Sequence, residues 1–186
     1  MSLRRGFKAE ANRISLRLRT SLRLAPHSPI ELGAVAKQLG VTIVQLTSLA
    51  DKCEKAVRHL VHVEQGAFSA ATLPLDGERR ILVHNDSHSR PRQRSNIAHE
   101  LAHIILKHPF TLPIDPTGCR NLDRDIEDEA NWLGSTILIP DEAALHIVRE
   151  AMDTRTACSH YEVSEQMLRM RINASGARIR VGRRYN

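Results

Sequence analysis

The chain has 186 residues, of which 41% are hydrophobic, 26% are charged and only 3% are aromatic. This length and composition predict one compact domain, or one domain with a small appendage, around a core of Leu, Ile, Val and Ala. No apolar run approaches the roughly 18 residues that a membrane-spanning helix needs. No apolar segment of the kind found in secretory signals follows the basic N-terminus, so we expect no membrane association.

Three cysteines, Cys53, Cys119 and Cys158, lie far apart in the sequence and include no Cys-x-x-Cys pair. Neither a disulfide framework nor a cysteine-ligated zinc site is therefore expected. A reduced, cytoplasmic protein is the simplest interpretation.

The formal net charge of +6 is unevenly distributed. Residues 1–24 carry seven Lys and Arg and one acid, and residues 169–186 carry six Arg and no acid, so residues 25–168 have a net charge of −6. A basic chain can indicate a nucleic-acid partner, but the acidic middle argues against a nucleic-acid surface across the whole body. Solvated basic ends are the favoured interpretation.

Apolar periodicity and turn residues predict the first elements of the chain. An amphipathic helix is expected over residues 4–24. A second helix is expected from Ser28-Pro29-Ile30-Glu31, which has a capping serine, a proline at the first helical position and a glutamate three residues after the cap. Gly40 ends this helix, and the alternating residues 41–46 predict a strand.

The same signals continue to the C-terminus. Residues 51–62 look helical, and Asp76-Gly77 predicts a tight turn between strands over residues 68–75 and 79–83. Further helices are expected from Pro91 and over residues 123–139, 141–152 and 164–173. The loop at residues 109–118 is either a lid or specificity element, or a plain connection. The order of helices, a few strands and more helices predicts an α+β fold.

Residues 95–108, SNIAHELAHIILKH, contain an H-E-x-x-H motif in which His99 and His103 bracket Glu100. On a helix, positions four apart lie about 40° apart around the axis, so both imidazoles can reach one metal ion. The glutamate lies on the flank, where it can act on water as a general base without being a ligand. Apolar residues beside the histidines indicate a helix that is covered on two sides. The motif therefore predicts a zinc site rather than a histidine-rich surface helix.

Such a site needs a third protein ligand, with one position left for water. His108 lies nine residues after His99 without the glycine that precedes the third histidine of metzincins, and helical geometry turns it toward the core. An acidic helix offers four better candidates, Asp125, Glu127, Asp128 and Glu129. Of these, Glu129 lies nearest the apolar stripe and is favoured, whereas Glu127 is expected on the opposite flank. Solvated acids at a helix N-terminus are the alternative for all four.

The chain resembles the ImmA/IrrE family of metallopeptidases at landmarks that follow one another along nearly the whole sequence. They are R-R-G-F-K from Arg4, S-A-A-T from Ser69, Asn85, A-H-E-L-A-H-I-I-L-K-H from Ala98, E-A-N-W-L-G-S-T-I-L-I-P from Glu129 and V-S-E-Q-M-L-R-M-R-I from Val163. Each piece alone is unspecific, whereas the combination is specific. One departure is Gly134, where many relatives have alanine; we expect it to affect stability more than chemistry.

The resemblance implies a zincin-like fold, with His99, His103 and Glu129 as metal ligands and Glu100 as the catalytic acid/base. Zn²⁺ is the expected ion, with another divalent metal such as Mn²⁺ as the alternative. The implied substrate is a partner protein, a helix-turn-helix transcriptional repressor. We expect the metallopeptidase domain to span residues 1–140 and a C-terminal helical extension with a basic tail to span residues 141–186.

The residue that stabilises the oxyanion of the transition state is not singled out by the sequence. A donor besides the metal is needed. The candidates are His84, His88, Arg94, His108 and Tyr161.

Two other functions stay open. A helix beginning at Val163-Ser164, followed by Arg169, Arg171 and the basic tail, could contact DNA or a repressor, although apolar residues within it favour packing over groove readout. A metal-bound anti-repressor that sequesters its partner without cleaving it would keep the same fold. The intact Glu100 argues against that alternative.

Overall fold

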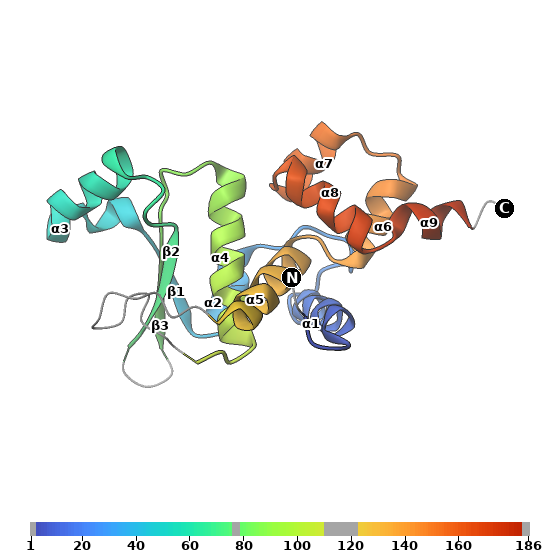
Figure 1. Ribbon diagram of the computed structural model, residues 1–186, viewed down its shortest axis with the longest axis horizontal. Helices are drawn as coiled ribbons and strands as arrows, with labels where there is room; N and C mark the ends of the chain where they lie inside the picture. The colour runs from blue at the N-terminus through green and yellow to red at the C-terminus, as the bar shows by residue number, and fades with distance from the viewer. Residues whose placement is uncertain (1–2, 76–78, 110–122, 184–186) are drawn as a thin grey trace.

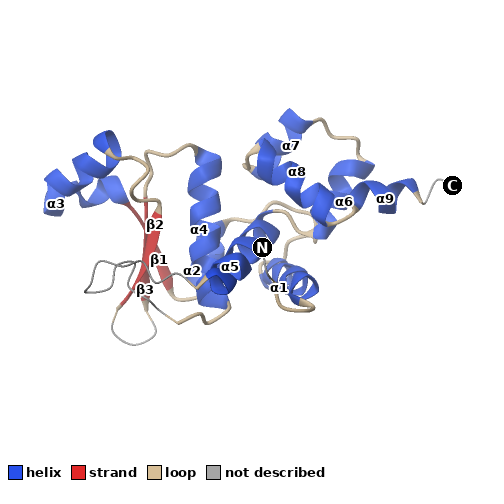
Figure 2. Cartoon of the chain, in the orientation of Figure 1, coloured by secondary structure: helices blue, strands red, loops and turns tan. Residues whose placement is uncertain are grey.

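The structure is a computed structural model that describes residues 3–75, 79–109 and 123–183. It has an α+β fold in which helices pack against a small sheet (Figure 1, Figure 2), and this confirms the predicted fold class. In chain order the elements are α1 (Phe7–Ser21), α2 (Leu32–Gln38), β1 (Val41–Gln45), the 3-10 turn η1 (Leu46–Leu49), α3 (Ala50–Arg58), the π-helical turn η2 (His59–Val63), β2 (Ala70–Pro74), β3 (Arg80–His84), α4 (Arg90–Ile105), α5 (Arg124–Leu138), α6 (Asp141–Arg149), α7 (Thr154–Tyr161), α8 (Glu165–Ala174) and α9 (Ala177–Gly182).

The three strands form one mixed sheet in the order β1-β3-β2. β1 runs parallel to β3 with Val41 opposite Arg80, and β2 runs antiparallel to β3 with Ala70 opposite His84. The predicted hairpin is therefore present, although its tip at Asp76-Gly77 lies outside the described residues. Because β3 lies in the middle, β2 is an edge strand within the described part of the chain.

The helix that carries the H-E-x-x-H motif lies between two layers. α4 packs against β2 and β3 on one side and against α5 on the other, and α1 packs in turn on α5. Figure 1 shows α4 standing between the sheet and α5. Its residues Leu101 and Ala102 are completely buried. The structure thus covers the motif helix on two sides, as the apolar residues beside the histidines predict.

The four C-terminal helices, α6 to α9, form a group on the side of α4 and α5 away from the sheet (Figure 1). Arg171 fixes this group, because its buried guanidinium donates to the Ile139 carbonyl at 2.8 Å and to Asp141 at 2.9 Å. The predicted domain boundary at residue 140 falls between α5 and α6. One hydrophobic cluster nevertheless contains buried residues from Phe7 to Ala177, and the division into two parts stays a prediction.

The predicted start of the second helix is wrong. α2 begins at Leu32 with Glu31 at its N-cap, three residues after the expected Ser28 cap. The Ser28 carbonyl accepts from Arg19 at 3.0 Å, and the carbonyl of fully buried Ile30 accepts from Arg94 at 2.8 Å. These long-range contacts use the carbonyls that a first helical turn would need, so the segment stays outside the helix.

The predictions for the C-terminal helices have mixed outcomes. Sequence periodicity predicts helices that match α6 and α8, and Ser164 caps α8 by accepting from the Met167 amide. It misses α7, with eight residues, and α9, with six, because helices of two turns carry too few apolar repeats to be recognised. Residues 110–118 of the expected lid or specificity loop lie outside the described residues.

The sequence predicts neither a disulfide framework nor a membrane-spanning helix. Cys53 and Cys158 are free thiols, and Cys119 lies outside the described part. No helix in the described ranges is both long and apolar enough to cross a membrane.

Candidate metal centre

Two histidine side chains of α4 face one another one turn apart. Nε2 of His99 and Nε2 of His103 are 3.0 Å apart, and the two rings meet edge to face at 75°. The side chains are 23% and 22% exposed, so the pair is largely shielded and still accessible from one side. The structure brings these two residues together as their spacing of four on a helix requires.

The carboxylate that meets the histidines belongs to Glu127, in the first turn of α5. Its Oε2 lies 3.3 Å from Nε2 of His99, and its Oε1 lies 3.5 Å from Nε2 of His103. In the described part of the chain, these three residues form a group whose potential ligand atoms all lie within 4.8 Å of one another. The expectation that Glu127 lies on the opposite flank of its helix is therefore wrong.

Glu129, the carboxylate expected to complete the site, makes different contacts. Its Oε1 accepts a hydrogen bond from Nε of Arg4 at 2.7 Å, and its Oε2 lies 3.7 Å from Nε2 of His108. Nδ1 of His108 in turn lies 3.0 Å from Nδ1 of His103. His108 therefore lies on the side of the His103 ring opposite His99, and Glu129 contacts His108 rather than the histidine pair.

The preference for Glu129 in the sequence rests on the face assigned to α5. From Ala130 onward this helix is buried around most of its circumference, at Ala130, Trp132, Leu133, Gly134, Ser135, Thr136, Ile137 and Leu138. Apolarity therefore does not single out the side that faces α4. Gly134 marks the side of α5 that faces α4, because a Cβ there would lie 3.1 Å from backbone atoms of Ala98 and His99. Glu127 precedes Gly134 by seven residues, about two turns, and shares its face.

Glu100 lies on the flank of α4 that reaches the edge strand. Its Oε2 accepts a hydrogen bond from Oγ1 of Thr72, in β2, at 2.8 Å. Among the described residues this contact uses one oxygen of the carboxylate, so the other is available to accept a proton. Sequence reasoning placed Thr72 in a family landmark but assigned it no role.

Burial and neighbouring charges set the protonation states of the group. Burial, reinforced by His99 and His108, lowers the pKa of His103 to about 4. Burial also lowers the pKa of His99, but Glu127 and Glu100 together outweigh it, and the pKa of His99 is raised. The hydrogen bond with His99 lowers the pKa of Glu127. At neutral pH His103 is therefore neutral and Glu127 is a carboxylate, the states that metal ligation needs. The raised pKa of His99, in contrast, means that a metal competes with a proton there.

The donor set fits a divalent metal ion. Two imidazole nitrogens and one carboxylate are donors of catalytic zinc sites, with bonds of about 2.0–2.2 Å. Tetrahedral ligands at such distances lie about 3.3 Å from one another. The separations here, 3.0, 3.3 and 3.5 Å, are close to that value, so His99, His103 and Glu127 could hold one ion with little movement.

The five candidate oxyanion donors lie in different places. His108 is the one that contacts His103. Arg94 and Tyr161 each donate to a main-chain carbonyl, at 2.8 and 2.9 Å, and so serve packing. His84 ends β3, His88 follows it, and both are buried.

An H-E-x-x-H helix packed between a small sheet and a helix that brings an acidic donor defines a zincin-like, metallopeptidase-type domain. Comparison with protein families matches residues 36–173 to Peptidase_M78, the IrrE N-terminal-like domain. The chain belongs to this family, which confirms the resemblance seen in the sequence. The match includes α4 and α5 and ends within α8. No curated protein sequence matches the chain significantly.

Proposed function

We propose that the protein is a zinc-dependent endopeptidase that hydrolyses a peptide bond in a protein substrate. The observation that carries this proposal is the convergence of His99, His103 and Glu127 beside Glu100. In the proposed site these three residues hold the metal, so Glu127 takes the place that the resemblance gave to Glu129. Zn²⁺ suits two imidazoles and one carboxylate best, and Mn²⁺ is the alternative.

The reaction assigns separate tasks to the surrounding residues. When bound, a divalent cation supplies Lewis acidity, which lowers the pKa of water and polarises the scissile carbonyl. Glu100 takes the proton of the attacking water and later delivers it to the leaving amine. Thr72 holds Glu100 in place by donating to its Oε2.

The edge strand offers a place for an extended substrate. Within the described residues β2 pairs with β3 alone, so its other edge can form main-chain hydrogen bonds with a peptide. Thr72 belongs to this strand and contacts Glu100. A peptide aligned with β2 would therefore pass the catalytic carboxylate, with chain on both sides of the cleaved bond. This arrangement favours an endopeptidase.

We further propose that the substrate is a helix-turn-helix transcriptional repressor in the cytoplasm. The support is the family resemblance, which implies such a partner. A protein that binds the repressor without cleaving it is the alternative, and both forms of the proposal share the same metal centre.

The test uses purified, zinc-loaded protein and, as substrate, a helix-turn-helix repressor encoded in its gene neighbourhood, if the neighbourhood holds one. We expect internal cleavage, detected by mass spectrometry, that chelation abolishes. A Glu100→Gln variant should retain its zinc and lose cleavage. If that variant cleaves at the wild-type rate, Glu100 is not the base. If the wild type binds the repressor and leaves it intact, sequestration replaces hydrolysis as the function.

A further inference from the structure

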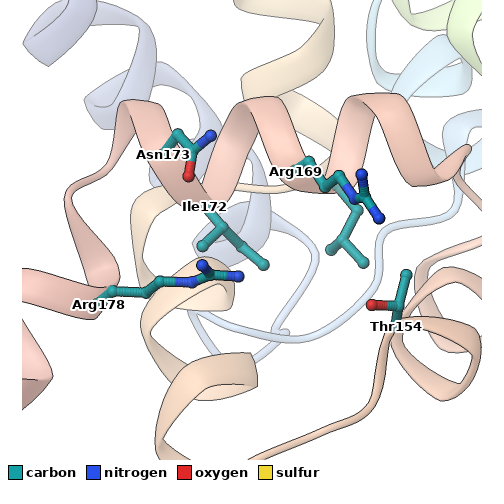
Figure 3. A pocket seen from close by; sticks show the side chains of 6 residues that line it. Thr154, Arg169, Ile172, Asn173 and Arg178 are labelled. Carbon is teal, nitrogen blue, oxygen red and sulfur yellow. The ribbon is translucent and has the colours of Figure 1, made fainter.

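A pocket of about 290 Å³ lies among the C-terminal helices, apart from the metal centre. It is formed by the start of α7, one face of α8 and the start of α9 (Figure 3). The lining residues are Thr154, Leu168, Arg169, Ile172, Asn173 and Arg178. α9 lies beyond the residues matched to the family, so one wall of the pocket falls outside the shared domain.

The pocket combines an apolar floor with a basic rim. Leu168 and Ile172 are the buried residues of α8 that form the floor. Arg169 and Arg178 are exposed and come from different helices. Figure 3 shows Ile172 between them, with Arg178 reaching toward it from α9. A ligand seated on the floor would therefore meet a guanidinium at either end.

The positive charge of this region favours an acidic ligand. Residues 169–186 contain six Arg and no acid. Arg169 has a partner in Glu165, one turn earlier, whereas Arg178 forms no ion pair with the residues that the structure describes. An exposed guanidinium without a carboxylate can bind one from a partner bidentately, which is the arrangement Arg favours.

We infer that this pocket is a docking site for an acidic peptide segment of a partner protein. An aliphatic side chain of the segment packs on Leu168 and Ile172, and flanking carboxylates pair with Arg178 and Arg169. The volume lies just below the roughly 300–1,000 Å³ of small-molecule sites. It therefore suits one or two side chains of a peptide better than a cofactor.

Nucleic acid fits this face less well. A helix-turn-helix reader presents the first residues of its second helix to the bases. Here Arg169 and Arg178 flank the apolar side chains of Leu168 and Ile172. These apolar side chains offer phosphates nothing to bind, whereas an apolar side chain of a peptide can pack on them.

The helices of the pocket are connected to the helix that carries the metal centre. Glu162, in the turn before α8, forms ion pairs with Arg90 and Arg94 of α4, at 3.2 and 3.1 Å. α4 also carries His99 and His103. The use of the pocket as a substrate-docking site rests on the proposed function, whereas peptide binding itself does not.

The experiment measures peptide binding to the full chain carrying Glu100→Gln, so that cleavage does not interfere. The probe is a short fluorescein-labelled peptide with a leucine flanked on both sides by glutamates, followed by fluorescence anisotropy. Arg178→Glu should weaken binding by about tenfold or more, as loss of a charged hydrogen-bonded pair does. Asn173→Trp, which fills the pocket without removing a charge, should also weaken it. Arg180→Glu, an equal charge change on α9 outside the pocket, is the matched control and should retain binding within about twofold.

Three results would overturn the inference. The first is equal weakening by Arg178→Glu and Arg180→Glu, because binding would then follow net charge. The second is a failure of the peptide to behave as a ligand of this pocket: either the glutamate-flanked peptide does not bind, or it binds equally well when serine replaces its leucine. The third is Arg178-dependent binding of duplex DNA in place of the peptide. A wild-type protein that lacks peptidase activity while the peptide binds would remove the proposed function and leave the docking site.

Discussion

Glu127 contacts His99 across the interface between α5 and α4, with its Oε2 3.3 Å from Nε2 of the imidazole. We predict that Glu127→Gln lowers zinc affinity by at least about 100-fold, because it removes a ligand rather than a group that orients one. Competition with a chromogenic chelator measures this affinity. Asp125→Asn, an equal charge change at an exposed position of the same helix, should leave it nearly unchanged.

Glu129→Gln distinguishes the two possible ligand sets. If Glu129 acts only through His108, this variant should lose less zinc affinity than Glu127→Gln. The reverse order would restore the ligand set of His99, His103 and Glu129 that the sequence resemblance implied.

The hydrogen bond from Thr72 to Glu100 predicts a kinetic effect without a binding effect. Thr72→Val keeps the shape of the side chain and removes the donor, so Glu100 loses its orientation. A hydrogen bond to a charged group is worth about 1.5–3 kcal/mol, and we expect kcat to fall by about tenfold or more with KM and zinc content nearly constant. Thr72→Ser restores the hydroxyl and should recover most of the activity. A Thr72→Val enzyme with wild-type kcat would leave Thr72 with a purely structural role.

The contacts from Glu129 through His108 to His103 predict coupled effects on the metal. His108→Phe removes the nitrogen that lies 3.0 Å from Nδ1 of His103, and Glu129→Gln removes the carboxylate beside His108. Each should weaken zinc binding by about tenfold, the usual cost of losing a group that orients a ligand. The double variant should be little worse than either single one, because both act on one chain of contacts. Fully additive losses would show that the two residues act independently.

Much of this architecture follows from local sequence patterns. The long helix α4 and the hairpin strands are set by proline, turn residues and periodicity within a single segment. The position of His99 beside His103 likewise depends only on helical geometry. These features need no knowledge of the tertiary structure, and the structure contains all of them.

The features that sequence reasoning missed depend on contacts between distant segments. α2 starts late because Arg19 and Arg94 take up the carbonyls of Ser28 and Ile30. The acidic donor could not be chosen from apolarity, because α5 is buried on nearly every side beyond its first turn. Arg4, more than a hundred residues away in sequence, donates a hydrogen bond to Glu129. A pattern read along one helix does not reveal which acid a distant arginine neutralises.

Gly134 links the packing of α5 to the metal centre, and its replacement tests that link. An alanine Cβ would lie 3.1 Å from the carbonyl carbon and oxygen of Ala98 and from the amide nitrogen of His99. Helix backbone cannot yield as a side chain can, so α5 has to move away by a few tenths of an ångström. The overpacking costs about 1–3 kcal/mol, partly offset by the roughly 1 kcal/mol that alanine gains over glycine in a helix. Because Glu127 lies on the same face, its carboxylate moves away from His99 with the helix.

We therefore predict that Gly134→Ala lowers zinc affinity as well as the free energy of unfolding, measured by chelator competition and by urea denaturation. Gly33→Ala is the matched control, since Gly33 also lies in a helix but a Cβ there meets nothing within 4 Å. That variant should be neutral or slightly stabilising and leave zinc binding unchanged. A Gly134→Ala protein that is less stable but binds zinc normally would confine Gly134 to packing, as the sequence alone suggests. Unchanged stability and zinc binding would mean that α5 can move without cost, and that this close approach does not hold Glu127 against His99.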